Sequence, residues 1–256
     1  MVLLSGLSGC IGPEVTDYFT GEYSINPSTT LSVTNLNGQV DIIGWEGENV
    51  TVSAVKTSSY GEEGLQNVNI SVSQTGNHIE IITRYTSQKI IQARVDYTIK
   101  VPYNVTLDTI TSSNGAIYIS NTSGDILALT SNGAIRINDV NGVVSATTSN
   151  GHIEIQRTLG IGDVHTSNAA ITAEVRSFQE DISIDTSNAA ITVYLNHLLN
   201  TTMEMTTSNA DIKLQGITLN ESLSENTHVI GILGVDGHRI DIHTSNAHIY
   251  VYPLQP

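Results

Sequence analysis

Apolar residues alternate with polar ones along most of the chain, in pairs on either side of a recurring Ser-Asn-Gly or Ser-Asn-Ala tripeptide. In the copy around Asn132, for example, Ile126 and Ala128 precede the tripeptide, and Ile135 and Ile137 follow it. This alternation is typical of strands with one buried face, and no stretch has the period of an amphipathic helix. Each repeat is therefore predicted to hold two short strands that meet at the Ser-Asn-Gly/Ala corner.

The corner asparagine recurs at short and nearly regular intervals. Seven copies carry it, at Asn114, Asn132, Asn150, Asn168, Asn188, Asn209 and Asn246. The successive steps are 18, 18, 18, 20, 21 and 37 residues. A fixed period of this kind marks a repeat protein whose units stack on one another. The expected fold class is all-β, a single-chain β-solenoid with 18–21 residues in each regular coil.

Both ends of the array depart from the regular repeat. The segment LSVTNLNGQVDI at residues 31–42 has the same spacing around Asn37 and is predicted to form the first coil. The last step is close to two periods, so residues 216–237 are interpreted as a degenerate coil with a polar loop at residues 220–228. Residues 106–256 are thus expected to form the regular repeats.

Alternating segments between the first coil and the regular array predict antiparallel hairpins at residues 46–105. One hairpin loop is expected at residues 74–77, with connections at residues 62–64 and 88–92. Such hairpins would cap the stack, because an open coil end exposes unpaired strand edges. Residues 29–256 are therefore expected to form one β-solenoid domain.

The corner asparagines have two interpretations. Stacked coils lie about 4.8 Å apart, so the asparagine side chains could form a hydrogen-bonded ladder that holds the coils together. Alternatively, they could form a polar strip that recognises a ligand. Because every coil needs a corner, the repetition favours the structural interpretation. Glycine and asparagine are also expected to suit this corner by tolerating positive φ.

The chain is acidic, with 10 Lys and Arg against 25 Asp and Glu and a formal net charge of −15. An acidic surface repels nucleic acid and anionic lipid, so neither is an expected partner. Simple solubility explains the acidity equally well.

The N-terminus carries the one cysteine of the chain. Leu7, Ser8, Gly9 and Cys10 resemble a prokaryotic lipobox, in which the cysteine is lipidated, and residues 1–9 resemble part of a lipoprotein signal segment. The segment is short and has no basic start, and a chance cysteine remains the alternative. Residues 10–28 are interpreted as a tether.

Six glycosylation sequons are present, at Asn49, Asn69, Asn104, Asn121, Asn200 and Asn220. They would accept glycans only in an export pathway with the matching transferase. A chain rich in Asn, Ser and Thr is also expected to contain such sequons by chance.

Several of these segments occur in an order that resembles a known family. They are the segment at residues 31–42, Gly44 and Trp45 followed by residues 50–52, residues 97–102 (YTIKVP), and Leu107 leading into the Ser-Asn-Gly repeats. This order resembles the "putative adhesin" family of bacterial and archaeal envelope proteins. The resemblance implies a β-solenoid at the cell envelope with no catalytic residues and no cofactor.

Candidate chemistry is confined to a few outward positions. Asp163, His165 and Asp185 are expected to lie on adjacent coils, where a metal or acid–base site is conceivable. The other outward ionisable residues considered are Glu204, Asp241, His243, His152 and His248. No phosphate loop, nucleophile elbow or zinc-ligand spacing is found in the sequence. We therefore expect no catalytic, cofactor or metal residues, and an exposed ion pair between Arg136 and Glu154.

These observations predict a non-enzymatic, lipid-anchored protein of the cell surface or envelope that serves in adhesion or as a scaffold. Its partner would be an envelope polysaccharide or a surface protein. Two alternatives stay open, a carbohydrate-binding or carbohydrate-active β-helix and a sensory scaffold for envelope stress. A row of aromatic side chains would favour sugar binding, but Tyr118 and Tyr250 are expected to lie far apart in the stack.

Overall fold

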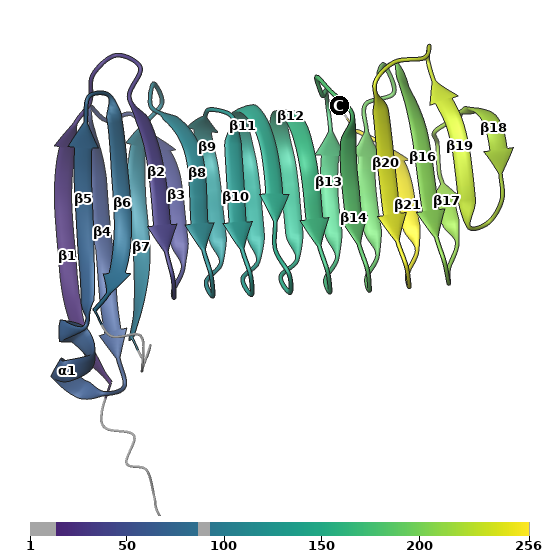
Figure 1. Ribbon diagram of the computed structural model, residues 1–256. Helices are drawn as coiled ribbons and strands as arrows, with labels where there is room; N and C mark the ends of the chain where they lie inside the picture. Colours follow the sequence, from purple (N-terminus) through teal and green to yellow (C-terminus); the bar gives the residue numbers. More distant parts are fainter. Residues whose placement is uncertain (1–13, 87–92, 256) are drawn as a thin grey trace, which may run out of the picture.

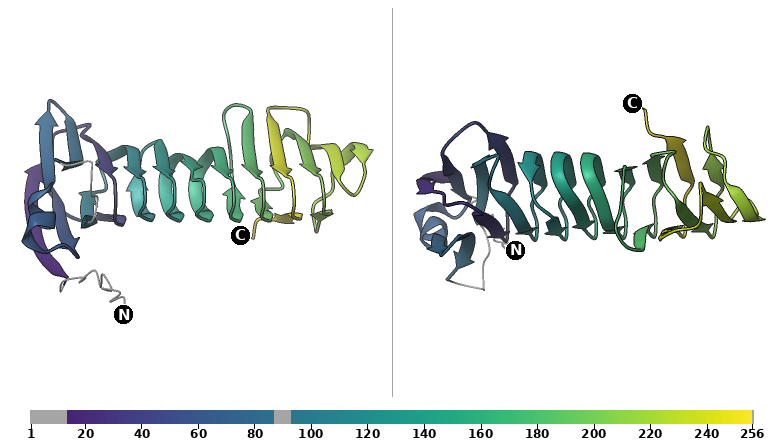
Figure 2. Two further views of the ribbon diagram at one scale, coloured as in Figure 1. Left: turned by 60° about the horizontal axis from the view of Figure 1, so that its bottom comes forward. Right: turned by 90° about the horizontal axis from the view of Figure 1, so that it is seen from above.

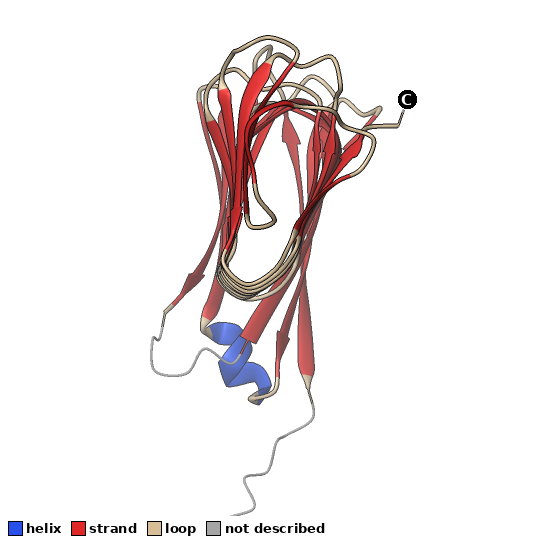
Figure 3. Cartoon of the chain, turned by 90° about the vertical axis from the view of Figure 1, so that its right-hand side faces the viewer, coloured by secondary structure: helices blue, strands red, loops and turns tan. Residues whose placement is uncertain are grey.

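The computed structural model describes residues 14–86 and 93–255. Its strands form one continuous sheet of 21 strands, folded into two layers that face each other across the core (Figures 1 and 3). One six-residue helix, α1 (Gly61–Gln66), is present in the described part of the chain. The all-β prediction is confirmed.

We call the two layers A and B. Layer A contains, in spatial order, β5 (Val68–Thr75), β6 (His78–Tyr85), β2 (Thr30–Asn35), β8 (Thr106–Ser112), β10 (Ile126–Thr130), the second halves of β11 (Ile135–Thr147) and β12 (Ile153–Thr166), β14 (Ile182–Thr186), β20 (Arg239–Thr244), β16 (Thr201–Thr207), β19 (His228–Leu233) and β18 (Asn220–Ser224).

Layer B contains, in spatial order, β1 (Val15–Ser24), β4 (Asn49–Ser58), β7 (Ala93–Pro102), β3 (Val40–Trp45), β9 (Ile117–Ser123), the first halves of β11 and β12, β13 (Ile171–Val175), β15 (Ile191–Leu195), β21 (Ile249–Pro253) and β17 (Ile212–Leu214). The chain passes from layer A to layer B at the Ser-Asn-Gly/Ala corners. Seen end-on, these corners superimpose as a bundle of U-shaped loops (Figure 3).

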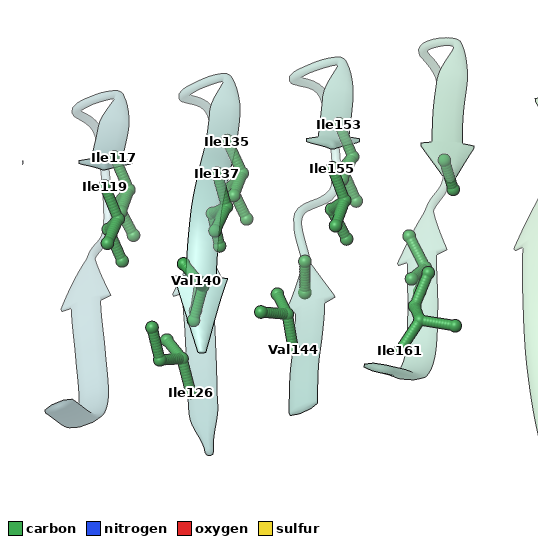
Figure 4. Close-up of a cluster of buried hydrophobic side chains, with 14 of the residues drawn as sticks. Ile117, Ile119, Ile126, Ile135, Ile137, Val140, Val144, Ile153, Ile155 and Ile161 are labelled. Atoms are coloured by element: carbon green, nitrogen blue, oxygen red, sulfur yellow. The ribbon is translucent and has the colours of Figure 1, made fainter. Parts of the chain in front are cut away.

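Equivalent positions of successive repeats pair in parallel register. Ile135 pairs with both Ile117 and Ile153, and Ile153 pairs with Ile171, so each step advances the chain by one repeat. The paired isoleucines are at most 1 % exposed and form a column inside layer B, opposite Ile126, Val144 and Ile161 of layer A (Figure 4). Burial of one side-chain face of each strand accounts for the period of two in the sequence.

The cap at residues 46–105 contains the antiparallel pairs β5–β6 and β4–β7, and parallel pairing of β6 with β2 and of β7 with β3 joins it to the stack. Strands β5 and β6 form a hairpin whose turn contains Gly76 at a φ of 61°, and β4 pairs antiparallel with β7. The connection expected at residues 62–64 lies in helix α1, which packs against β4 and β1 and buries the side chain of Leu65. The connection expected at residues 88–92 lies outside the described residues.

The tether interpretation of residues 10–28 is wrong over much of its length. Residues 15–24 form β1, which pairs antiparallel with all ten residues of β4. The reason is that Phe19 and Tyr23 pack against the hydrophobic core, an alternation that the proline and glycine residues of this segment obscured. Residues 1–9 and Cys10 lie outside the described part.

The degenerate coil predicted at residues 216–237 is also wrong. This segment contains β18 and β19, which form an antiparallel hairpin, and β19 pairs antiparallel with β16 at the far end of layer A. The chain then turns back, and β20 and β21 enter the stack between repeats already formed (Figures 1 and 2). A step of 37 residues fits either an extra coil or such a hairpin, so spacing alone cannot separate them.

Candidate functional site

The corner asparagines form an unbroken ladder of hydrogen bonds along one edge of the molecule. Each Nδ2 donates to the Oδ1 of its neighbour toward the cap, at distances from 2.6 to 2.8 Å. The order from the cap is Asn37, Asn114, Asn132, Asn150, Asn168, Asn188, Asn246 and Asn209. The amides also donate to serine carbonyls of the preceding coil, as Asn168 does to Ser149 at 3.4 Å. Asn150, Asn188, Asn209 and Asn246 make the same second bond. Since these side chains use both amide protons between coils, the ladder has a structural role.

A second ladder, which the sequence analysis missed, lies beneath the asparagines. A buried hydroxyl residue lies two positions before each asparagine from Asn114 onward, Ser112 in the first of these coils and threonine in the others. Its hydroxyl donates to a backbone carbonyl of the neighbouring coil. Thr148 donates to Gly133 at 3.1 Å and accepts from the amide of Gly151 at 3.3 Å. The recurrence of threonine at this position indicates such a ladder, but alternation alone predicts only that the residue faces inward.

The expectation that corner glycines are needed for positive φ is wrong. Among the described corners only Gly38 has positive φ, at 108°, and no corner asparagine does. A Cβ at Gly133 would instead overlap the carbonyl oxygen of Gly115, and one at Gly151 would overlap that of Gly133. Glycine is therefore required by the close approach of stacked backbones.

Of the trio Asp163, His165 and Asp185, the structure brings His165 and Asp185 into contact on the outer face of layer A. His165 and Asp185 are register partners, and His165 Nδ1 lies 2.5 Å from Asp185 Oδ1. Asp163 binds elsewhere, because its Oδ1 accepts from the amide of Ser183 at 2.8 Å. The side chains of His165 and Asp185 are 42 % and 31 % exposed. The pair thus lies on an open strand surface.

The polar row continues over the neighbouring strands. His243 pairs in register with Asp185, but its Nδ1 contacts the Thr206 hydroxyl at 2.9 Å. Arg239 forms ion pairs with both Asp241 and Glu204. Among residues 14–86 and 93–255, no three His, Cys, Asp or Glu side chains are arranged to hold a metal ion.

On layer B, Arg136 forms the expected ion pair with Glu154, with Nε 3.3 Å from Oε2. Its guanidinium also lies 5.7 Å from the ring centroid of Tyr118. The other two histidines considered, His152 and His248, occupy equivalent positions in coils that are not adjacent, and each is half-buried.

A tyrosine cluster near the far end of layer B was missed by the sequence analysis. Tyr194 and Tyr252 are register partners on β15 and β21, with ring centroids 5.7 Å apart. Tyr250 lies 6.4 Å from Tyr252 with ring planes only 6° from parallel, and His248 lies 5.7 Å from Tyr250. Lys213 places its ammonium 5.7 Å from the Tyr250 ring. We call these five residues the tyrosine patch.

The edge opposite the asparagine ladder carries an unusual backbone. Asn121, Asp139 and Arg157 occupy the same position of three successive repeats and have φ values of 56°, 55° and 49°. The backbone amide of Arg157 donates to Glu174 at 2.8 Å. Its guanidinium makes two hydrogen bonds to Asp139, of 2.7 and 2.8 Å, which lower the pKa of the Asp139 carboxyl. Thr122, Asn141 and Leu159 line a groove beside these charges. Because the charges are mutually satisfied, the groove is interpreted as part of the scaffold.

The structure describes the predicted glycosylation sites but not the predicted lipidation site. Cys10 lies outside the described residues. Five of the six sequon asparagines are exposed, whereas Asn49 is half-buried and donates to Glu22 at 2.7 Å. In the part of the chain that the structure describes, no helix has the length and apolar character to cross a membrane.

Comparisons with known proteins give no family assignment. No family model and no curated protein matches the chain. Three solved structures are similar to most of it: a "putative cell adhesion protein" from Clostridium sporogenes (10 % identity, 93 % of this chain and 100 % of that chain, TM-score 0.38), a "putative adhesin" from Bacteroides fragilis (11 %, 93 % and 97 %, 0.39) and a "putative lipid binding protein" from Parabacteroides distasonis (11 %, 92 % and 96 %, 0.36). At such scores we base no conclusion on them.

Proposed function

We propose that the chain is a β-solenoid that serves as a non-enzymatic adhesion or scaffold module of the cell envelope. The observation that carries the proposal is the pair of continuous ladders, one of asparagines and one of buried hydroxyls, which tie eight coils into a stiff rod. At about 4.8 Å for each coil, the stack is roughly 40 Å long without its caps. Such a rod presents two broad strand faces to a partner.

The outer faces support a binding role better than a catalytic one. Catalysis by a histidine and carboxylates needs them to converge around a substrate in a site that excludes water. His165 and Asp185 bind each other on an open face, and Asp163 is engaged by a backbone amide. The expected result of a screen with acidic and neutral polysaccharides is no turnover. Turnover that disappears in a His165→Ala/Asp185→Ala double variant would overturn this part of the proposal.

An envelope location with a lipid anchor at Cys10 is part of the same proposal. Strand β1 begins at Val15 and pairs with β4 of the cap. Five residues span at most about 18 Å, so a lipid on Cys10 would hold the cap close to the membrane. The hairpin of β18 and β19 at the other end of the stack would then point outward. The acidic surface would keep the rod away from anionic lipid.

Two experiments test the proposal separately. Expressed with its natural leader in a bacterial or archaeal host, the protein is expected to partition into detergent with the membrane fraction, and Cys10→Ser is expected to abolish this. An unmodified Cys10 in the mature protein, detected by mass spectrometry, would exclude the anchor. For the binding role, purified protein should retain a component of envelope polysaccharide or surface-protein fractions, and retention of none from either fraction would exclude it.

A further inference from the structure

We propose that the tyrosine patch (Tyr194, Tyr250, Tyr252, His248 and Lys213) is a binding surface for a glycan of pyranose sugars that carry carboxylates. The inference deepens the proposed function, because it names a ligand class and a place for one of the two presented faces. It does not depend on the anchor at Cys10.

The patch exists because of the order of the strands in layer B. Strand β21 pairs with β15 on one side and with β17 on the other. This places the two tyrosines of β21 beside Tyr194 and beneath Lys213, although residues from three separate repeats contribute. The aromatic row that would favour sugar binding is therefore present, but it forms between repeats that are not consecutive in the sequence.

The chemistry of the patch suits a sugar. The three rings are half-buried, so each keeps part of its surface in solvent. Within residues 14–86 and 93–255, the tyrosine hydroxyls that bond to protein are those of Tyr85 and Tyr97, both in the cap. The patch hydroxyls are therefore available to a ligand. Tyrosine combines an apolar ring with a polar tip, which matches the C–H face and the hydroxyl rim of a pyranose.

Lys213 adds a preference for acidic sugars, as a local positive charge on a chain whose net charge is −15. It is exposed, and the ion pairs of the described residues do not include it. An ammonium group without a carboxylate partner, held beside an aromatic ring, can accept a carboxylate from a ligand. His248 on the other side of Tyr250 adds a further polar ring.

The surroundings argue against a protein partner at this place. The register partner of Tyr194 on β13 is Glu174, and Tyr250 pairs with Thr192 on β15. Protein interfaces have an apolar, desolvated centre that is poor in charged residues. The patch instead contains a charged residue, Lys213, and is bordered by Thr192 and by Glu174, whose carboxylate is paired with Arg176 at 3.0 Å. Such polar groups suit the hydroxyl rim of a sugar.

The test is a binding titration of the purified full chain with polygalacturonate, alginate and hyaluronan, each compared with its carboxyl-reduced form. The wild type is expected to bind at least one acidic polymer more tightly than its reduced form. A Tyr250→Ala/Tyr252→Ala double variant should lose about tenfold or more in affinity. Lys213→Gln should weaken binding of the acidic polymer about threefold or more and leave binding of the reduced polymer unchanged.

Two further variants keep the result interpretable. Tyr118→Ala is the matched control, because Tyr118 occupies the position of Tyr250 in another coil and also lies beside a cation, Arg136. In the described part of the chain, no other tyrosine ring stacks on it. It should leave the affinity unchanged. Tyr250→Phe/Tyr252→Phe retains the rings and should keep most of the binding even if the alanine variant unfolds. Loss of binding in Tyr118→Ala equal to that in the alanine double variant would overturn the assignment to the patch.

Three results would overturn the inference. They are no binding of the wild type to any polymer, equal binding by the folded alanine variant, and equal affinity for acidic and reduced polymers in both wild type and Lys213→Gln. Retention of a surface protein from envelope fractions without any glycan binding would refute the patch while leaving the proposed function intact.

Discussion

Asn246 Nδ2 donates a hydrogen bond of 2.8 Å to Asn188 Oδ1, although 58 residues separate them. Asn209, which follows Asn188 in the sequence repeats, instead donates to Asn246 at 2.8 Å. The last repeat of the sequence is thus the second-last repeat of the asparagine ladder. In layer A, β19 of the hairpin pairs with the outer side of β16. The chain then returns to the inner side of β16, where β20 lies between β16 and β14.

This order can be tested with engineered disulfides in a Cys10→Ser background. Ser245 accepts a backbone hydrogen bond from Ser208 at 3.2 Å and donates one to Ser187 at 3.2 Å, so its coil lies between theirs. Ser187→Cys/Ser245→Cys should form a disulfide, because neighbouring strands lie about 4.8 Å apart and Cα atoms of disulfides are separated by about 4.4–6.8 Å.

The matched control is Ser187→Cys/Ser208→Cys, whose positions are two strand spacings apart, about 10 Å, and beyond the reach of a disulfide. Thiol titration after mild oxidation measures both variants. Crosslinking of the control pair in preference to the first pair would mean that the repeats stack in sequence order.

The two faces of the strands in layer B should respond very differently to truncation. Ile153 is 1 % exposed, and Ile153→Ala should cost about 2–5 kcal/mol in the free energy of unfolding, because it leaves a cavity in the isoleucine column. Glu154→Ala removes only an exposed ion pair with Arg136 and should cost less than about 1 kcal/mol. Denaturant melts compare the two, and equal losses would mean that the faces are assigned wrongly.

Repetition made much of this fold predictable. The buried face of each strand, the corner asparagines and the pairing of His165 with Asp185 all follow from equivalent positions that recur at a fixed step. Features set by contacts between distant segments did not follow. Strand β1 depends on β4, and the tyrosine patch depends on where β21 enters the stack. The local alternation of apolar and polar residues does not determine which distant strand β1 or β21 pairs with.

The corners with glycine should tolerate substitution less well than those with alanine. A Cβ at Gly133 would overlap the carbonyl of Gly115, so Gly133→Ala must push two coils apart and should cost about 1–3 kcal/mol. Ala169→Gly, at the equivalent corner of a coil that already accommodates a Cβ, should cost no more than about 1 kcal/mol. Thermal melts of both variants measure the two losses. If neither substitution changes the stability, the stacked corners are not closely packed.

The buried hydroxyl ladder should depend on hydrogen bonding and not on shape. Thr148 is 1 % exposed, and Thr148→Val keeps its shape but leaves the Gly133 carbonyl and the Gly151 amide without their partner. The expected loss is about 1–3 kcal/mol in the free energy of unfolding. Thr172→Val on the outer face, where the threonine is half-buried, is the control and should cost less than about 0.5 kcal/mol. Equal stability of the Thr148 variant and the wild type would show that the ladder contributes nothing.

The cap should lose stability in alkali because of Tyr97. This side chain is 1 % exposed, its hydroxyl lies 2.7 Å from that of Thr83, and burial raises its pKa to about 12. The unfolded chain, with an ordinary tyrosine pKa near 10, loses the proton first. Between about pH 10 and 12 the folded state therefore binds more protons than the unfolded state, and stability falls as the pH rises, by up to about 1.4 kcal/mol for each pH unit.

Denaturant melts at a series of alkaline pH values measure this slope, and Tyr97→Phe should reduce it. Burial also raises the pKa of Tyr85 and of Tyr23, so part of the slope should remain in the variant. Tyr18→Phe, at a side chain that is 72 % exposed, is the control and should leave the slope unchanged. The opposite result would be equal dependence of the unfolding free energy on alkaline pH in Tyr97→Phe and the wild type. Tyr97 would then ionise in the folded protein as readily as in the unfolded chain, and burial would not raise its pKa.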